Sequence, residues 1–397
     1  MRAAQASAVV LSHASGWSDW VAVAACVVAL APAGARWLRV AQREHYIAGA
    51  ASRFAVRWWR SEPLDVAVVV LGLAGVFLSG RWALCALAAA GAAIVGPLHL
   101  SVRGRTSRLV WTRRLRTLAC LWVVLQGALV GIGAAVGAPA PFAAAGALAA
   151  PALVDVALFL TAPLERRLSQ RYVRSAEHRL LRVQPTIVGI TGSYGKTSTK
   201  NHLAHLVTGS RAVVASPASF NNRVGLARAV NEQLADGTEV FIAEMGTYGP
   251  GEIRALCGWC PPAIAVITAI GPVHLERFGS EDAILTAKTE ITERASVVVL
   301  NVDDPRLAAL ADRLSMPGGR RVVRCSVRDR DADVCVEPAE GGLTVLVRGA
   351  VVATQLAVAP GVQPGNLACA VAVALELGVP GDAIAPDGFE LKVSSTT

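Results

Sequence analysis

One stretch of the chain, from residue 186 to residue 207, constrains the fold more than any other. Residues 186–190 (TIVGI) form a short β-branched run, which is typical of a buried parallel strand. A glycine-containing turn follows at once, and then the helix-prone residues 201–207. A strand, a glycine turn and a helix start in direct succession point free N–H groups and a positive dipole end at one spot. The pattern therefore predicts an α/β domain with a phosphate-binding loop.

The residues of this turn are those that an ATP site needs. Gly192 and Gly195 would let the backbone approach a phosphate, Lys196 could reach the β- and γ-phosphates, and the Thr197 hydroxyl could ligate Mg²⁺. The other predicted ATP contacts are Ser193, Tyr194 and Ser198. Ile190 stands where the general pattern has its first glycine, and a glycine turn with an exposed lysine is the structural alternative.

The first 165 residues have a different character, because apolar stretches long enough to cross a bilayer recur along them. A helical span needs roughly 20 residues, and we count about five stretches, near 21–38, 64–79, 82–100, 118–136 and 141–160. Pro32 and Pro151 are expected to kink or interrupt the first and the last. The 53% hydrophobic content of the whole chain agrees with a bilayer segment.

Arginine accumulates in alternate connections between these stretches, which predicts their orientation. Arginines are dense in residues 39–60, 103–116 and 166–182 and sparse in the other two links. An outside N-terminus, a multi-pass bacterial-type cell membrane protein and a cytoplasmic C-terminal half would produce this alternation. The +9 net charge is then membrane-flanking, and no nucleic-acid partner is expected, since few aromatics are interleaved with the arginines.

Three polar features of this half have open interpretations. Asp65 could cap a helix or mark an interface, and Asp155 lies in a span position without an obvious partner. Residues 165–182 read either as a basic helix at the anionic inner membrane surface or as a solvated linker.

The phosphate loop is the first of several blocks that together resemble the Mur ligase family. The loop TGSYGKTSTK is similar to that family's ATP loop. Further blocks follow in the family's order: SFNN at 219–222, AEMG at 243–246 with GEI at 251–253, IGPVHLERFG at 270–279, AKTE at 287–290, NVDD at 301–304 and NLA at 366–368. Within the family, the EMG, GEI and HLERFGS blocks resemble the branch that adds D-alanyl-D-alanine to UDP-N-acetylmuramoyl-tripeptide.

The resemblance implies a role for a residue in each block. Glu244 also follows a strand-like run, so Mg²⁺ is expected between it and Thr197. His274 would ligate a second metal ion, and Lys288 matches a lysine that is commonly carbamylated and then binds metal. The weaker assignments are Asn222 near the γ-phosphate or the reacting carboxylate, Asn301 at the adenine, and Asn366 at the nucleotide, beside Gln363 where the family has His. A lone CxxC at Cys257 and Cys260 is interpreted as a pair of packed or surface thiols.

The expected organisation has four parts: a membrane domain over 1–164, a basic linker over 165–184, a Mur ligase central domain over 185–385 with a mostly parallel sheet flanked by helices, and a truncated start or tail over 386–397. The family's uridine-binding N-terminal domain is replaced by the spans. Its C-terminal Rossmann-like domain is expected to be missing.

The sequence therefore predicts an ATP-dependent, amide-bond-forming ligase that acts through an acyl phosphate. Its predicted partners are ATP, Mg²⁺, a membrane and a muropeptide or lipid-linked substrate, to which D-Ala-D-Ala or an amino acid is added. Two alternatives stay open: a poly-γ-glutamate-type or other membrane-associated amide ligase, and a non-catalytic ATP-binding membrane scaffold or truncated inactive ligase.

Overall fold

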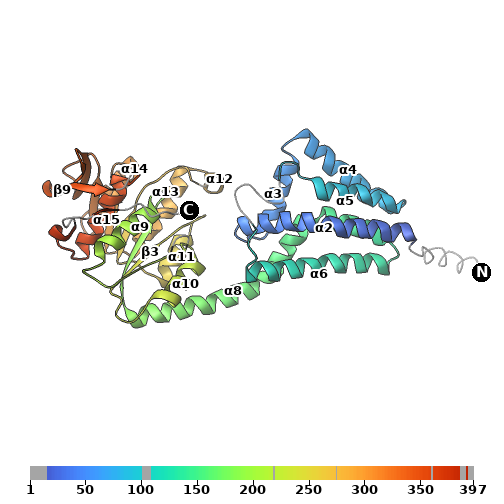
Figure 1. Ribbon diagram of the computed structural model, residues 1–397, viewed down its shortest axis with the longest axis horizontal. Helices are drawn as coiled ribbons and strands as arrows, with labels where there is room; N and C mark the ends of the chain where they lie inside the picture. The colour runs from blue at the N-terminus through green and yellow to red at the C-terminus, as the bar shows by residue number, and fades with distance from the viewer. Residues whose placement is uncertain are drawn as a thin grey trace, which may run out of the picture. The chain divides into compact units, whose positions relative to one another are not determined.

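The computed structural model describes residues 16–100, 109–217, 220–273, 275–358, 361–384 and 390–391. The chain divides into two compact units, Met1–Arg167 and Leu168–Thr397, each with its own core. The first unit is helical and the second is built on a sheet (Figure 1).

The first unit packs its helices around a core rich in alanine. Its elements are α2 (Trp17–Arg43), α3 (Ala50–Trp59), α4 (Pro63–Ser79), η1 (Ala83–Cys85), α5 (Ala86–Val95), α6 (Arg113–Ala135), α7 (Pro139–Leu148) and α8 (Ala150–Val183). Small side chains such as Ala29, Ala89 and Ala144 are fully buried and let the helices approach closely. Large apolar side chains on α4 and α6, including Phe77 and Val124, face outward.

The helices correct the expected pattern of spans. Among the described residues, α2 and α6 are each long and apolar enough to cross a membrane, while α3 with α4 and α7 with α8 are pairs bent by 114° and 78°. The stretch 141–160 is therefore not one straight helix. The chain bends at Ala149, and Pro151 two residues later has no N–H to continue the ladder of α7. Pro32, in contrast, lies within the single helix α2.

Several polar side chains in this unit form hydrogen bonds with backbone groups at or near helix ends. The Asp155 carboxylate accepts the backbone N–H groups of Ala51 (3.2 Å) and Ser52 (2.7 Å), which gives it a partner in the first turn of α3. The Arg36 guanidinium donates to backbone carbonyls at the end of α5, among them Ala93 (3.1 Å). Asp65 is buried in the first turn of α4 and accepts the N–H of Leu98 at 2.6 Å.

The basic segment 165–182 is neither a surface helix alone nor a solvated linker. It continues α8 to Val183, and Val173, Ala176 and Leu180 are buried in the core of the second unit. The Arg179 guanidinium also donates to the backbone carbonyl of Asn231. These residues give α8 an apolar face against the second unit, so the arginines occupy its remaining surface.

The second unit contains one mixed sheet of the order β10-β9-β8-β7-β6-β5-β4-β1-β3-β2. The strands are β1 (Thr186–Thr191), β2 (Val213–Ala215), β3 (Val240–Glu244), β4 (Ile264–Ile267), β5 (Val297–Asn301), β6 (Arg321–Ser326), β7 (Val334–Ala339), β8 (Gly342–Val347), β9 (Ala350–Val358) and β10 (Glu390–Leu391). In the part of the sheet from β7 to β2, all neighbouring strands are parallel. Strands β7, β8 and β9 form an antiparallel meander. The expected mostly parallel sheet flanked by helices is confirmed.

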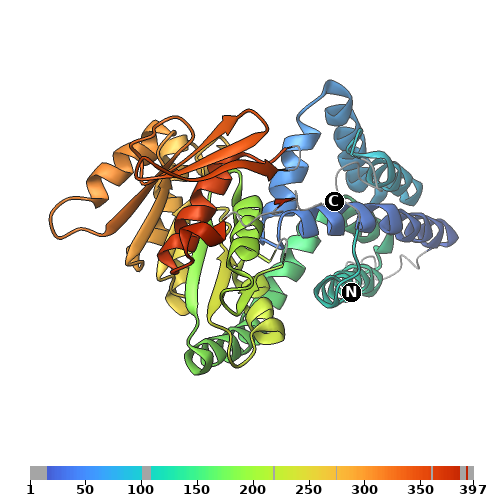
Figure 2. The ribbon, with the colours of Figure 1, turned by 60° about the vertical axis from the view of Figure 1, so that its left-hand side comes forward.

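Helices cover both faces of this sheet. They are α9 (Lys196–Val207), α10 (Arg223–Gln233), α11 (Glu252–Trp259), α12 (Leu275–Phe278), α13 (Glu281–Thr289), η2 (Glu290–Glu293), α14 (Pro305–Leu314), α15 (Pro364–Glu376) and η3 (Gly381–Ile384). Val188 of β1 faces the core with α9 and α15, and its neighbour Ile187 faces the core with α10, α11 and α14. Helices α9 and α15 lie side by side (Figures 1 and 2), and this places the start of α15 next to the turn after β1.

Candidate functional site

The turn between β1 and α9 has a backbone that only glycine fits at two places. Gly195 is the N-cap of α9 with φ +79°, and a Cβ there would overlap the side chain of Asn366 in the first turn of α15. Gly192 has φ +153°, and a Cβ there would overlap the Thr268 hydroxyl. Both glycines are thus required by close approach, and the N-terminus of α9 opens directly onto the turn.

The turn is fixed to the segment that follows β4. Ser193 donates its backbone N–H to the Ala269 carbonyl at 2.8 Å, and its hydroxyl lies 3.0 Å from both the N and the O of Gly271. The Thr268 hydroxyl donates to the Tyr194 carbonyl at 2.5 Å. These bonds hold the loop rigid, so its N–H groups are arranged before any anion arrives.

Glu244 ends β3 beside the start of α9, because β1 and β3 are parallel neighbours in the sheet. The Thr197 hydroxyl donates to Glu244 Oε2 at 2.8 Å. The Asn221 amide donates to Oε1 at 3.3 Å, and Lys200 Nζ lies 3.4 Å from Oε2. The carboxylate is 3% exposed and is held from three sides.

Two lysines near the turn between β1 and α9 have lowered pKa values. Lys196 Nζ donates to the Gly192 carbonyl at 2.7 Å, and burial lowers the pKa of Lys196 against the opposing effect of Glu244. Lys288 lies in the last turn of α13, where burial and, to a smaller extent, the charge of Lys196 lower its pKa to about 7. Titratable groups with shifted pKa values that lie near one another are typical of functional sites.

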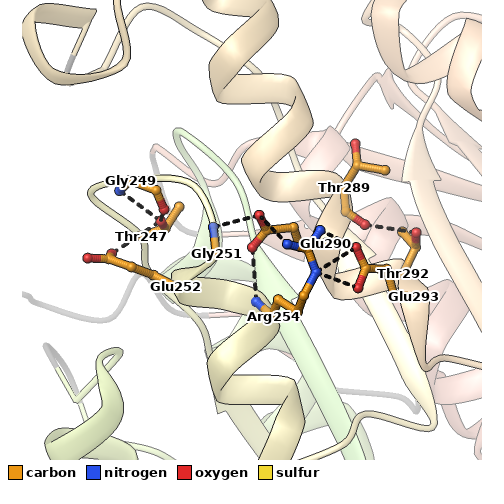
Figure 3. Close-up of polar contacts among 9 residues, drawn as sticks. All are labelled: Thr247, Gly249, Gly251, Glu252, Arg254, Thr289, Glu290, Thr292 and Glu293. Atoms are coloured by element: carbon orange, nitrogen blue, oxygen red, sulfur yellow. Dashed lines mark hydrogen bonds and ion pairs between the residues drawn. The ribbon is translucent and has the colours of Figure 1, made fainter.

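The residue two positions after Lys288 anchors the neighbouring loop (Figure 3). The buried Glu290 carboxylate accepts the N–H groups of Gly251 (2.7 Å) and Arg254 (3.0 Å) at the start of α11. The Arg254 guanidinium pairs in turn with Glu293, at 2.8 Å between Nε and Oε2. The turn that carries Lys288 is therefore bonded to the loop that follows Glu244.

The sequence-predicted residues fall into three groups. Thr197, Glu244, Lys196, Lys288 and Asn366 gather around the turn. Asn301, at the end of β5, accepts the Asp303 N–H at 3.2 Å, and its amide approaches Gly365, so it lies beside the start of α15. His274 lies outside the described residues.

The two asparagines of the SFNN block have different contacts. The Asn222 side chain is exposed and caps α10 by accepting the Gly225 N–H at 2.9 Å, while Asn221 contacts Glu244. Both residues belong to the SFNN block, and the sequence alone does not show which of the two side chains points toward Glu244. Lys200 and Glu290 were also missed, although both stand in quoted motifs. The helical spacing of Lys200 from Lys196 and Thr197 would have placed it on their side of α9.

The two cysteines of the CxxC are packed, as predicted. Both are free and buried, and burial raises the pKa of Cys257 to about 12 and that of Cys260 further. Such thiols are unreactive at neutral pH.

The hydroxyl and carboxylate oxygens at the turn are of the kind that Mg²⁺ prefers. Within the described residues no group of three or more His, Cys, Asp or Glu side chains could hold a metal ion. Mg²⁺ needs only one or two protein oxygens, because waters and phosphates fill the rest of its octahedron. Thr197 Oγ1 and the Glu244 carboxylate supply such oxygens next to the anion-binding turn.

Comparison with known proteins agrees with this geometry. Residues 190–374 match the family model described as Mur ligase middle domain. The UDP-N-acetylmuramoyl-tripeptide--D-alanyl-D-alanine ligase of Mycobacterium tuberculosis strain H37Rv is 39% identical over 206 residues, which cover 49% of this chain and 38% of that protein. The ligase of the same name from Bacillus subtilis is 38% identical over 125 residues, which cover 30% of this chain and 27% of that protein.

A solved structure of MurF ligase from Thermotoga maritima in complex with ADP is 27% identical and has a TM-score of 0.48. The match covers 55% of this chain and 52% of that one. The chain thus spans about half or less of the length of the relatives that it matches.

Proposed function

We propose that the chain uses residues 190–374, which match the Mur ligase middle domain model, to bind MgATP and to drive amide-bond formation on a cell-wall muropeptide precursor. Members of this family are ATP-dependent ligases that form amide bonds in peptidoglycan synthesis. The observation that carries the proposal is the contact between Thr197 Oγ1 and Glu244 at the mouth of a rigid phosphate turn.

In this proposal the turn holds the phosphates of ATP. The N–H groups of Tyr194, Gly195 and Lys196 and the dipole of α9 would face the β- and γ-phosphates, and Lys196 would exchange the Gly192 carbonyl for a phosphate oxygen. Thr197 and Glu244 would hold Mg²⁺, and the ion would supply positive charge to offset that of the γ-phosphate. Asn221, which is bonded to the same carboxylate, would lie near the γ-phosphate.

Lys288 and His274 are the other proposed metal ligands of the site. A lysine with a pKa of about 7 is partly neutral at physiological pH, and a neutral amine can add CO₂ to become a metal-binding carbamate. The proposal that His274 ligates a second metal ion rests on the resemblance of its block alone. Asn366 lies in the first turn of α15 and Asn301 lies beside it. Both positions are suitable for contacts with the part of the nucleotide beyond the phosphates.

The substrate assignment rests on the names of the relatives. Their ligases add D-alanyl-D-alanine to UDP-N-acetylmuramoyl-tripeptide, and we assign this chain a muropeptide or lipid-linked acceptor of the same kind. Purified chain in detergent would be given ATP, Mg²⁺, UDP-N-acetylmuramoyl-tripeptide and D-Ala-D-Ala, with mass spectrometry for the product. ADP, phosphate and a new amide are the expected products, and Lys196→Ala should yield none.

A second outcome of the same experiment has its own meaning. If the chain binds MgATP but releases no phosphate with any acceptor, including γ-glutamyl peptides, the result would favour the alternative that this chain is a non-catalytic ATP-binding membrane scaffold. Release with γ-glutamyl peptides alone would move the substrate assignment to another polymer.

The helical unit is proposed to lie in the cell membrane, with the ligase domain on the cytoplasmic side. Within the described part of the chain, the helices α2 and α6 are each long and apolar enough to span alone, and exposed side chains such as Phe77 and Val124 suit contact with lipid. The alternation of arginine-rich connections supports the orientation.

A further inference from the structure

Lys200 is a buried charge for which the proposed ATP site has no use. It lies one turn after Lys196 on α9, and its side chain is 2% exposed. Its Nζ lies 3.4 Å from Glu244 Oε2, the same oxygen that accepts the Thr197 hydroxyl. A buried ammonium is costly unless a carboxylate balances it, so the two groups depend on each other.

The position of Lys200 affects any cation that approaches Glu244. Before nucleotide binds, the carboxylate already has a resident positive partner, and Lys196 is a second ammonium nearby whose pKa responds to Glu244. A free divalent cation at Oε2 would add its charge to these two in a low-dielectric interior. Repulsion between like charges is strong there because water screens them poorly.

A polyphosphate reverses this balance. Its negative oxygens would engage Lys196 and the N–H groups of the turn, and they would supply the remaining ligands that the metal needs. Glu244 could then share its charge between Lys200 and the metal, since its second oxygen is held by the neutral Asn221 amide.

We propose that Lys200 is the internal counter-ion of Glu244 and makes metal binding conditional on nucleotide: free Mg²⁺ is excluded, and Mg²⁺ enters together with the polyphosphate. Lys200 is thus a positioning residue that acts through Glu244. The inference rests on the proposed function, because it takes Glu244 as the Mg²⁺ ligand.

The test measures metal binding, not turnover, with Mn²⁺ as a probe read by electron paramagnetic resonance on the full chain. Wild type should bind Mn²⁺ weakly without nucleotide and tightly with ADP. Lys200→Met should tighten nucleotide-free Mn²⁺ binding by about tenfold or more, because one positive charge is removed next to the ligand. Lys200→Arg keeps the charge and should behave as wild type.

Two further variants separate the outcomes. Lys200→Gln keeps a donor to Glu244, so it serves if Lys200→Met does not fold, and Glu244→Gln added to either variant should abolish the gained site. Unchanged nucleotide-free Mn²⁺ affinity in both Lys200→Met and Lys200→Gln would overturn the inference. Tight Mn²⁺ binding with ADP that survives Glu244→Gln would instead overturn the Glu244 assignment in the proposed function.

Discussion

At the scale of single residues, the site is defined by charges and by glycines whose neighbours leave no room. Lys196, Thr197 and Glu244 follow from the sequence, because a glycine turn and a strand end fix where they lie. The contact of Asn221, and not of Asn222, with Glu244 does not follow from the sequence, since one residue along an irregular segment reverses the direction of a side chain. The lysine behind the carboxylate is visible only when β3 and α9 are packed together.

The pKa of Lys288 gives a pH-dependent prediction. Burial makes its ammonium unfavourable, so the folded protein releases that proton near pH 7, whereas an exposed lysine does so near pH ~10.4. Stability from this group therefore rises as pH increases above about 7, and the penalty is fully present below it. Only the neutral amine adds CO₂.

With ¹³C-labelled bicarbonate, we expect an NMR carbamate signal that grows as the pH rises through about 7. Lys288→Met should remove the signal. A carbamate that forms only at the pH of an ordinary surface lysine would contradict the burial of this group.

Gly195 gives a prediction about backbone shape. Gly195→Ala forces an L-residue to φ +79° and pushes into Asn366, so we expect about 1–2 kcal/mol of lost stability and loss of ATP binding. Gly258→Ala is the matched control, since Gly258 lies exposed in α11 with open space around it and should be neutral or slightly stabilising. Thermal unfolding and nucleotide titration of both variants measure the effect, and equal behaviour would argue against the glycine requirement.

At the scale of elements, strands and helix starts were predictable where the chain signals them locally. The run 186–190 became β1, and the helix after it begins at Lys196. The bend at Ala149 and the docking of the end of α8 could not be read from hydropathy, because a bend depends on where neighbouring helices support the backbone.

The start of α11 gives an element-scale prediction. Glu290→Gln removes the buried negative charge that holds the Gly251 and Arg254 N–H groups. We expect local opening to become easier by about 1–2 kcal/mol, that is, roughly ten times faster hydrogen exchange across α11. The control Glu293→Gln breaks only an exposed pair with Arg254 and should change exchange by about twofold or less. Equal rates in the two variants would show that Glu290 does not anchor the helix.

At the scale of the whole molecule, composition alone separated an apolar helical part from an α/β part. The boundary between the two compact units lies between Arg167 and Leu168, within α8. The alternation of arginine-rich and arginine-poor connections predicts that the turn at Ala138, between α6 and α7, lies outside the cell.

The topology can be tested with a thiol reagent that does not cross membranes. A single Ala138→Cys, in a chain whose half-exposed Cys85 and exposed Cys120 are replaced by Ala, should be labelled on intact cells. A matched Val110→Cys, in the arginine-rich connection before α6, should react only after lysis. The opposite pattern would reverse the orientation.

The most direct test of the central claim is calorimetric titration of the purified chain with ATP, with and without Mg²⁺. Wild type should bind ATP in the presence of Mg²⁺, Lys196→Ala should lose binding, and Glu244→Gln should lose the Mg²⁺ dependence. ATP binding that is equally tight in wild type, Lys196→Ala and Glu244→Gln would contradict the assignment of the β1–α9 turn as the nucleotide site.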